Sequence, residues 1–137
     1  MATVELTAQN FDSVVGEADM ALVDFWASWC GPCRMFAPIY EKASQAHTDI
    51  TFASVDTEAE RGLSGALQIS SIPTLMAFRE KVLVFSQPGA LNAQQLEQVV
   101  DAVKALDMEE VHAHVARSQA EAAAAAGQQD GTQIPDA

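Results

Sequence analysis

The alternation of apolar and polar residues along the chain predicts short strands separated by helices. Residues 20–26 form a continuous apolar run rich in valine and aromatic side chains, which is typical of a strand buried at the centre of a sheet. Shorter runs of similar composition predict four more strands, at residues 3–6, 50–55, 74–78 and 82–85. Only Arg79, Glu80 and Lys81 separate the last two strands, so we expect a hairpin there.

Capping residues and apolar residues at helical spacing predict about four helices between and after these strands. The expected spans are residues 8–16 capped by Thr7, residues 31–47 with a kink at Pro38, residues 56–65, and a last helix capped by Asn92. Five apolar residues of this last helix share one face: Leu96, Val99, Val100, Val103 and Leu106. Crossover helices imply parallel strand pairs and the hairpin adds antiparallel ones. The sequence therefore predicts an α/β fold with one mixed central sheet of about five strands.

The composition changes near the end of the chain, which predicts a domain over residues 1–107 and an acidic, alanine-rich extension over residues 108–137. Val111 and Val115 could prolong the last helix by two turns, so the extension is expected to begin as a helix. Residues 127–137 are polar with two glycines and a proline, which is typical of disordered chain. We expect the extension to solvate the end of the domain, and docking to a partner is the alternative.

The charge balance argues against two classes of partner. The chain has 137 residues, of which 7 are Lys or Arg and 19 are Asp or Glu, giving a net charge of −12. Neither a nucleic-acid backbone nor an anionic membrane surface attracts such a protein. Residues 1–10 lack the pattern of a secretory signal, and the apolar stretch 20–29 is too short to span a membrane. We therefore expect a cytoplasmic monomer.

The chemistry is predicted to reside in the two cysteines, Cys30 and Cys33. A structural zinc site typically needs four ligands and the three histidines supply no second cysteine pair, so no metal is expected. The cysteines flank Gly31 and Pro32 at a predicted helix start, where unpaired N–H groups and the helix dipole stabilise a thiolate. Cys30, in the first turn, would attack a substrate disulfide. Cys33, deeper and more covered, would then attack Cys30 and release the substrate.

Three further residues are candidates for this site. Asp24 lies within the apolar strand, six residues before Cys30, so burial should raise its pKa. It could accept the proton of Cys33, and a structural, hydrogen-bonded carboxylate is the alternative. Pro73 precedes a strand and is a candidate for a cis peptide, which would leave the backbone of Ile72 open to an extended substrate. Trp29 is expected to form a partly exposed rim beside the sulfur.

These motifs together resemble the thioredoxin family over about residues 4–107. Residues 23–35, Val-Asp-Phe-Trp-Ala-Ser-Trp-Cys-Gly-Pro-Cys-Arg-Met, are similar to its active-site signature. Residues 71–74, Ser-Ile-Pro-Thr, are similar to its cis-proline turn, and residues 88–90, Pro-Gly-Ala, to the glycine turn beside its substrate groove. The resemblance implies the thioredoxin fold and a general protein-disulfide reductase that maintains cytosolic thiols and donates electrons to redox enzymes.

The resemblance also implies partners and roles. Disulfide-containing proteins would be the substrates, and an NADPH-dependent flavoprotein, thioredoxin reductase, would recharge the dithiol with no cofactor bound to the chain itself. Cys30 would be the nucleophile, Cys33 the resolving thiol and Asp24 the proton acceptor, while Pro73 shapes the groove. The implied contacts for substrate and reductase are Trp29, Gly31, Pro32, Ile72, Gly89 and Ala90.

The chain departs from the family pattern at three places. Many members carry a lysine near position 52, paired with the buried aspartate; here Phe52 stands there, which should raise the pKa of Asp24 further. The hairpin has Glu80 and Lys81 in place of the usual glycine, so its turn is either a strained type I′ turn or another type. The extension has no counterpart in the minimal family domain.

Two other classes remain alternatives. A disulfide oxidase or isomerase would use the same dithiol, although Gly31 and Pro32 between the cysteines and the lack of an export signal disfavour it. A binding module would use the acidic domain and extension, with the dithiol secondary. Replacing both cysteines would separate these classes, because only a binding module would keep its function.

Overall fold

The computed structural model describes the backbone of residues 3–133 and the side chains of residues 3–126. Its strands are β1 Thr3–Glu5, β2 Met20–Trp26, β3 Thr51–Asp56, β4 Thr74–Arg79 and β5 Val82–Pro88. Its helices are α1 Phe11–Glu17, α2 Gly31–Ala46, α3 Arg61–Ala66, α4 Ala93–Lys104 and α5 Met108–Gln133. The chain divides into two compact units, residues 1–105 and residues 106–137. The second unit contains α5.

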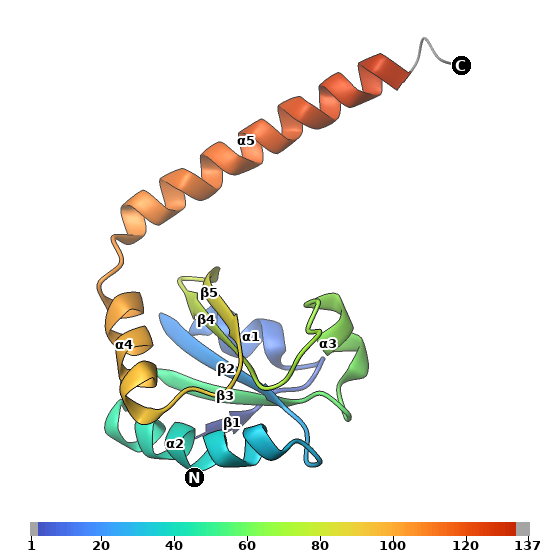
Figure 1. Cartoon of the computed structure of the whole chain (residues 1–137). Helices are drawn as coiled ribbons and strands as arrows, with labels where there is room; N and C mark the ends of the chain where they lie inside the picture. Colours follow the sequence, from blue (N-terminus) through green and yellow to red (C-terminus); the bar gives the residue numbers. More distant parts are fainter. Residues whose placement is uncertain (1–2, 134–137) are drawn as a thin grey trace. The chain divides into compact units, whose positions relative to one another are not determined.

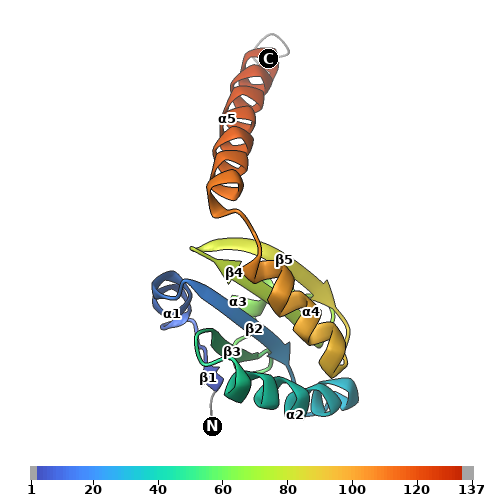
Figure 2. The same cartoon turned by 90° about the vertical axis from the view of Figure 1, so that its left-hand side faces the viewer.

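The five strands form one mixed sheet in the order β1-β3-β2-β4-β5, with β2 at its centre. β2 runs parallel to β3 and antiparallel to β4, so that Asp24 lies opposite Ser54 on one side and Leu75 on the other. α2 and α4 cover one face of the sheet, while α1 and α3 cover the other (Figures 1 and 2). The predicted mixed α/β architecture is confirmed.

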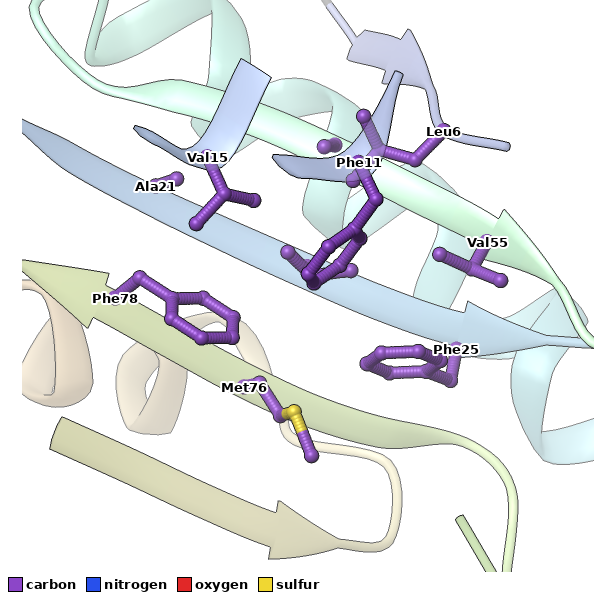
Figure 3. Packing of buried hydrophobic residues seen from close by; sticks show 10 residues of the cluster. Leu6, Phe11, Val15, Ala21, Phe25, Val55, Met76 and Phe78 are labelled. Carbon is purple, nitrogen blue, oxygen red and sulfur yellow. The ribbon is translucent and has the colours of Figure 1, made fainter. Parts of the chain in front are cut away.

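Burial on both faces explains why residues 20–26 are apolar without alternation. On the face of α1, Val23 and Phe25 pack in a cluster with Phe11, whose ring meets the edge of Phe78 at 5.9 Å between centroids (Figure 3). On the face of α2, the ring of Tyr40 lies 5.2 Å from that of Phe52. The Tyr40 hydroxyl also donates a 2.7 Å hydrogen bond to the carbonyl of Ala53, which joins α2 to the sheet.

Two helices begin later than predicted, because capping side chains first form turns. The Thr7 hydroxyl accepts the N–H of Gln9, and the Asn10 side chain accepts the N–H of Thr7, so residues 8–10 form a turn and α1 starts at Phe11. Asp56 likewise accepts the N–H groups of residues 58 and 59, and α3 starts only at Arg61. Both predicted starts, at residues 8 and 56, are therefore wrong.

The end of the chain also differs from its prediction. α4 ends at Lys104, and the Asp107 carboxylate accepts the N–H groups of Glu109 and Glu110 to begin a separate helix, α5. Val111 and Val115 thus belong to α5 and do not prolong α4. The helical backbone of α5 continues through Gln133, into the segment 127–137 that was expected to be disordered. Residues 134–137 lie outside the described residues. The proposed boundary at residue 107 stays a prediction.

Two other local predictions can be compared with the structure. Asn92 caps α4 through a reciprocal pair of hydrogen bonds with Gln95, as a capping box requires, so the predicted cap is confirmed. Pro38 lies inside α2 as expected, while the kink there stays a prediction. Among the described residues, no helix has the length and apolar character needed to cross a membrane.

The hairpin between β4 and β5 turns through Glu80 and Lys81, whose φ angles are 50° and 72°. Two positive φ angles are what a type I′ turn requires, so the strained alternative is the correct one. We expect Lys81→Gly to raise the free energy of unfolding by about 0.5–1 kcal/mol, because glycine adopts this backbone without a Cβ clash. Chemical denaturation measures the gain. Lys81→Ala is the matched control, and an equal gain there would show that the backbone is not its source.

Candidate active site

The two cysteines occupy the junction between β2 and α2. Cys30 is the N-cap of α2, and Gly31 and Pro32 form the start of the helix. Cys30 and Cys33 are joined in a disulfide, with their Cα atoms 5.3 Å apart. The Sγ atom of Cys30 accepts the backbone N–H of Cys33 at 3.2 Å. A donor of this kind, together with the helix N-terminus, favours the thiolate form of Cys30 when the disulfide is reduced.

The two cysteines hardly differ in exposed area, although Cys33 is the less exposed of the two, in the predicted order. Cys30 is 4% exposed and Cys33 is 3% exposed, because Trp26, Ala27 and Ile72 pack against them. The two cysteines differ instead in which open space of the protein each one lines. Cys30 lines a groove of about 450 Å³, whereas Cys33 lines a separate cavity of about 600 Å³ that also contains Asp24.

The groove beside Cys30 is formed by the turn before β4. The Ile72–Pro73 peptide bond is cis, as predicted, and the carbonyl oxygen of Ile72 lies 3.8 Å from the Cys30 sulfur. Gly89 donates its N–H to the carbonyl of Pro73 at 2.8 Å, with a φ of 101° that favours glycine. This hydrogen bond brings Gly89 and the exposed Ala90 to the cis-proline turn. Ile72 therefore approaches the Cys30 sulfur from a distant part of the chain, and Gly89 adjoins the same turn.

Trp29 is the exposed rim residue that the sequence predicts. Its side chain is 65% exposed, and its indole N–H donates to the Glu58 carboxylate at 2.9 Å. Glu58 also pairs with Arg61 at 3.0 Å. Sequence reasoning missed Glu58 and also Thr57, which lines the groove. The signal that could have found Thr57 is its position directly after β3, because the carboxyl ends of the parallel strands β2 and β3 meet at one edge.

Ser70 and Ser71 also line this groove, together with Gly31, Pro32 and Ile72. Ser71 belongs to the Ser-Ile-Pro-Thr turn, residues 71–74, whereas nothing in the local pattern singles out Ser70. Among the described residues, no group of three or more His, Cys, Asp and Glu side chains gathers in a way that would hold a metal ion.

Asp24 is the only acidic residue among the buried side chains of the described part of the chain, at 4% exposed. Its Oδ1 atom has no hydrogen-bond partner among the described residues, and loss of hydration raises its pKa from 3.8 to about 7. Across the sheet Ser54 lies opposite Asp24, while Phe52 lies opposite Leu22 and is 1% exposed, so neither residue brings a positive charge. Burial and the nearby Asp24 also raise the pKa of Tyr40.

A dithiol at a helix N-terminus, set at the edge of a mixed sheet beside a cis-proline turn, defines a thiol–disulfide oxidoreductase. A family model described as Thioredoxin matches residues 2–102. The chain is 54% identical over 121 residues to a Streptomyces coelicolor protein named "Putative thioredoxin 2", covering 88% of this chain and 90% of that protein. The chain belongs to the thioredoxin family.

Solved structures agree with this assignment. A thioredoxin from Plasmodium falciparum superimposes with a TM-score of 0.69 at 32% identity, covering 73% of this chain and 98% of that one. A chain from a study of thiol resolution in a yeast mitochondrial 1-Cys peroxiredoxin via glutathione/thioredoxin systems gives a TM-score of 0.68 at 27% identity, covering 73% and 94%. The Streptomyces match is longer than residues 1–105, so the similarity reaches into the second unit.

Proposed function

We propose that this chain is a protein-disulfide reductase that transfers two electrons from its dithiol to protein substrates. The observation that carries the proposal is the position of Cys30, which caps α2 and borders a groove with the Ile72 carbonyl 3.8 Å away. An extended substrate could pair with this backbone and present its disulfide to the sulfur. Trp29, Gly31, Pro32, Ile72, Gly89 and Ala90 are the proposed contacts, and Pro73 shapes the groove.

The proposed reaction has two exchange steps. The Cys30 thiolate attacks one sulfur of the substrate disulfide, forming a mixed disulfide while the other substrate sulfur leaves as a thiolate and takes a proton. Cys33 then gives its proton to the Asp24 carboxylate and attacks the Cys30 sulfur, which breaks the mixed disulfide. The second substrate sulfur leaves as a thiolate and takes a proton from water. The chain is left with the Cys30–Cys33 disulfide that is present in this structure.

The pKa of Asp24 supports its role as proton acceptor. A pKa of about 7 lets the carboxyl group exchange a proton near neutral pH, which an ordinary aspartate cannot do. Asp24 and Cys33 also line the same cavity, which keeps the proton transfer away from the substrate groove.

An NADPH-dependent thioredoxin reductase is the proposed electron source, and the cytoplasm the proposed compartment, because thiols are kept reduced there. The relative from the peroxiredoxin study supports oxidised thiol peroxidases as one class of substrate. The net charge of −12 favours partners with basic surfaces, since opposite charge speeds encounter.

The reduction potential of the Cys30–Cys33 couple tests the proposed function. We expect a two-electron transition at about −270 mV, the value known for thioredoxins, in a titration followed by the fluorescence of Trp26 and Trp29. A potential of about −180 to −120 mV would instead indicate an isomerase or oxidase. The double variant Cys30→Ser/Cys33→Ser is the control, and should show no transition and no consumption of NADPH with reductase and a disulfide substrate.

A further inference from the structure

The cavity of about 600 Å³ that contains Asp24 is also lined by Cys33, and the reaction proposed above uses only these two residues and leaves the rest of its space free. Asp24, Ala27 and Cys33 are its buried residues at the dithiol end, and Trp26 and Tyr40 supply an aromatic wall. The exposed Ala37 also lines it, so the cavity reaches the surface. Its volume falls within the range of small-molecule sites, about 300–1,000 Å³.

This cavity and the groove beside Cys30 are separate. They have no lining residue in common within the part of the chain that the structure describes. A molecule in the cavity would therefore contact Cys33 and Asp24 while Cys30 stays open to a substrate.

The charges around the cavity select the chemistry of its occupant. Asp24 presents a carboxyl group whose Oδ1 atom has no hydrogen-bond partner among the described residues, although the side chain is 96% buried. Glu41 adds a second carboxylate, which accepts the Thr3 hydroxyl at 3.3 Å. Arg34 is the one cation among the cavity's described lining residues, and it donates to the Ser28 carbonyl at 3.1 Å. A buried acceptor in an apolar wall is stabilised most by a charged N–H donor.

We propose that this cavity binds a small organic monocation, a primary ammonium on a short apolar or aromatic stem, with the ammonium at Asp24. The stem would pack on Trp26 and Tyr40, where aromatic faces attract both apolar groups and cations. An anion would meet two carboxylates, and a neutral molecule would leave the charge of Asp24 without a counterion.

Binding in this cavity would affect Asp24 and Cys33 and would leave the groove beside Cys30 open. A cation beside Asp24 favours the ionised carboxylate and so lowers the pKa of Asp24. The protonation of the proposed proton acceptor therefore depends on whether the ligand is bound. The inference goes beyond the proposed function, and its test by binding does not require any reductase activity.

The test is a titration of the oxidised full chain with 2-phenylethylammonium, followed by NMR shifts of the backbone amides at pH 8.5. We expect the largest shifts around Asp24, Cys33 and Tyr40. Its neutral isostere 2-phenylethanol should bind at least about tenfold more weakly, a difference of about 1.4 kcal/mol. Asp24→Asn should weaken binding of the ammonium by at least about tenfold, while Asp101→Asn, the same change on the exposed surface of α4, should leave it unchanged.

Two further measurements guard against a folding artefact. Ala37→Phe keeps Asp24 and fills the mouth of the cavity, so it should also abolish the shifts, whereas Gln45→Phe on the exposed side of α2 should not. Affinity should rise as pH increases through the pKa of Asp24, because the ammonium stays charged like a lysine. The other charged or titratable groups that line the cavity are Arg34, Tyr40 and Glu41.

The inference is overturned by any of three results. These are no shifts around the cavity, equal binding of 2-phenylethanol, or binding that survives both Asp24→Asn and Ala37→Phe. A normal reduction potential with no ammonium binding would reject this inference and keep the proposed function. Ammonium binding in a protein without the expected reduction potential would keep this inference and reject the proposed function.

Discussion

Replacing Cys33 with serine should stop multiple turnover and leave substrates covalently attached to Cys30. The attack on the substrate disulfide needs only the Cys30 thiolate, which the helix N-terminus and the Cys33 N–H favour. Release needs a second thiolate, and a serine hydroxyl cannot supply it. We expect turnover in a reductase-coupled assay to fall by more than about 10³-fold, as when other enzymes lose a catalytic nucleophile. Non-reducing electrophoresis and mass spectrometry would identify the mixed disulfide.

Cys30→Ser is the matched control, because it removes the other sulfur with the same change of atom. It should be equally inactive and should trap no substrate, since Cys33 borders the inner cavity and not the groove. Equal trapping at Cys33 in this variant would reverse the two roles. Absence of any adduct in Cys33→Ser would argue against the exchange mechanism itself.

Replacing Asp24 with asparagine should stabilise the oxidised protein strongly at high pH and hardly at all at low pH. Burial raises the pKa of Asp24 from 3.8 to about 7, so between these values the folded protein holds a proton that the unfolded chain has released. Stability therefore falls as pH rises through this window. The total loss above pH 7 is on the order of 4 kcal/mol, and asparagine avoids it because it does not ionise.

Urea denaturation from pH 4 to pH 9 would measure this effect. The difference in unfolding free energy between Asp24→Asn and the original chain should be near zero at about pH 4 and reach its maximum above pH 7. Asp101→Asn makes the same chemical change on the exposed surface of α4 and should alter stability by less than about 0.5 kcal/mol. A gain that does not vary with pH would mean that the charge of Asp24 is not its source.

The main elements of the fold could be predicted from local pattern alone. Residues 20–26 were identified as a central strand because a strand covered by helices on both faces is apolar throughout. Asn92 and Gln95 form a cap within four residues, so the start of α4 was visible in the sequence. The cysteine pair was equally visible, since both sulfurs lie within the first turn of one helix.

The predicted helix boundaries were wrong where one polar side chain could form two alternative sets of local hydrogen bonds. Thr7, Asp56 and Asp107 can each either extend a helix or fold the next residues into a turn. Thr7 and Asp56 form turns that delay a helix, and Asp107 ends one helix and begins another. The energies of these alternatives are similar, so contacts with the rest of the molecule decide between them.

The sequence by itself determined the chemistry and the succession of strands and helices in this protein, because both depend on residues that are near one another in the chain. The cysteine spacing, the buried Asp24 and the proline before β4 all belong to this class. Only the tertiary structure decided which cavity each sulfur borders and how Ile72 and Thr57 approach Cys30. It also decided that the Asp24 Oδ1 atom has no hydrogen-bond partner among the described residues. The physical reason is that a cavity and an unpaired acceptor arise from the packing of α2 on the sheet. That packing joins residues far apart in the chain, such as Thr3 and Glu41, which are 38 positions apart, and no local pattern records such contacts.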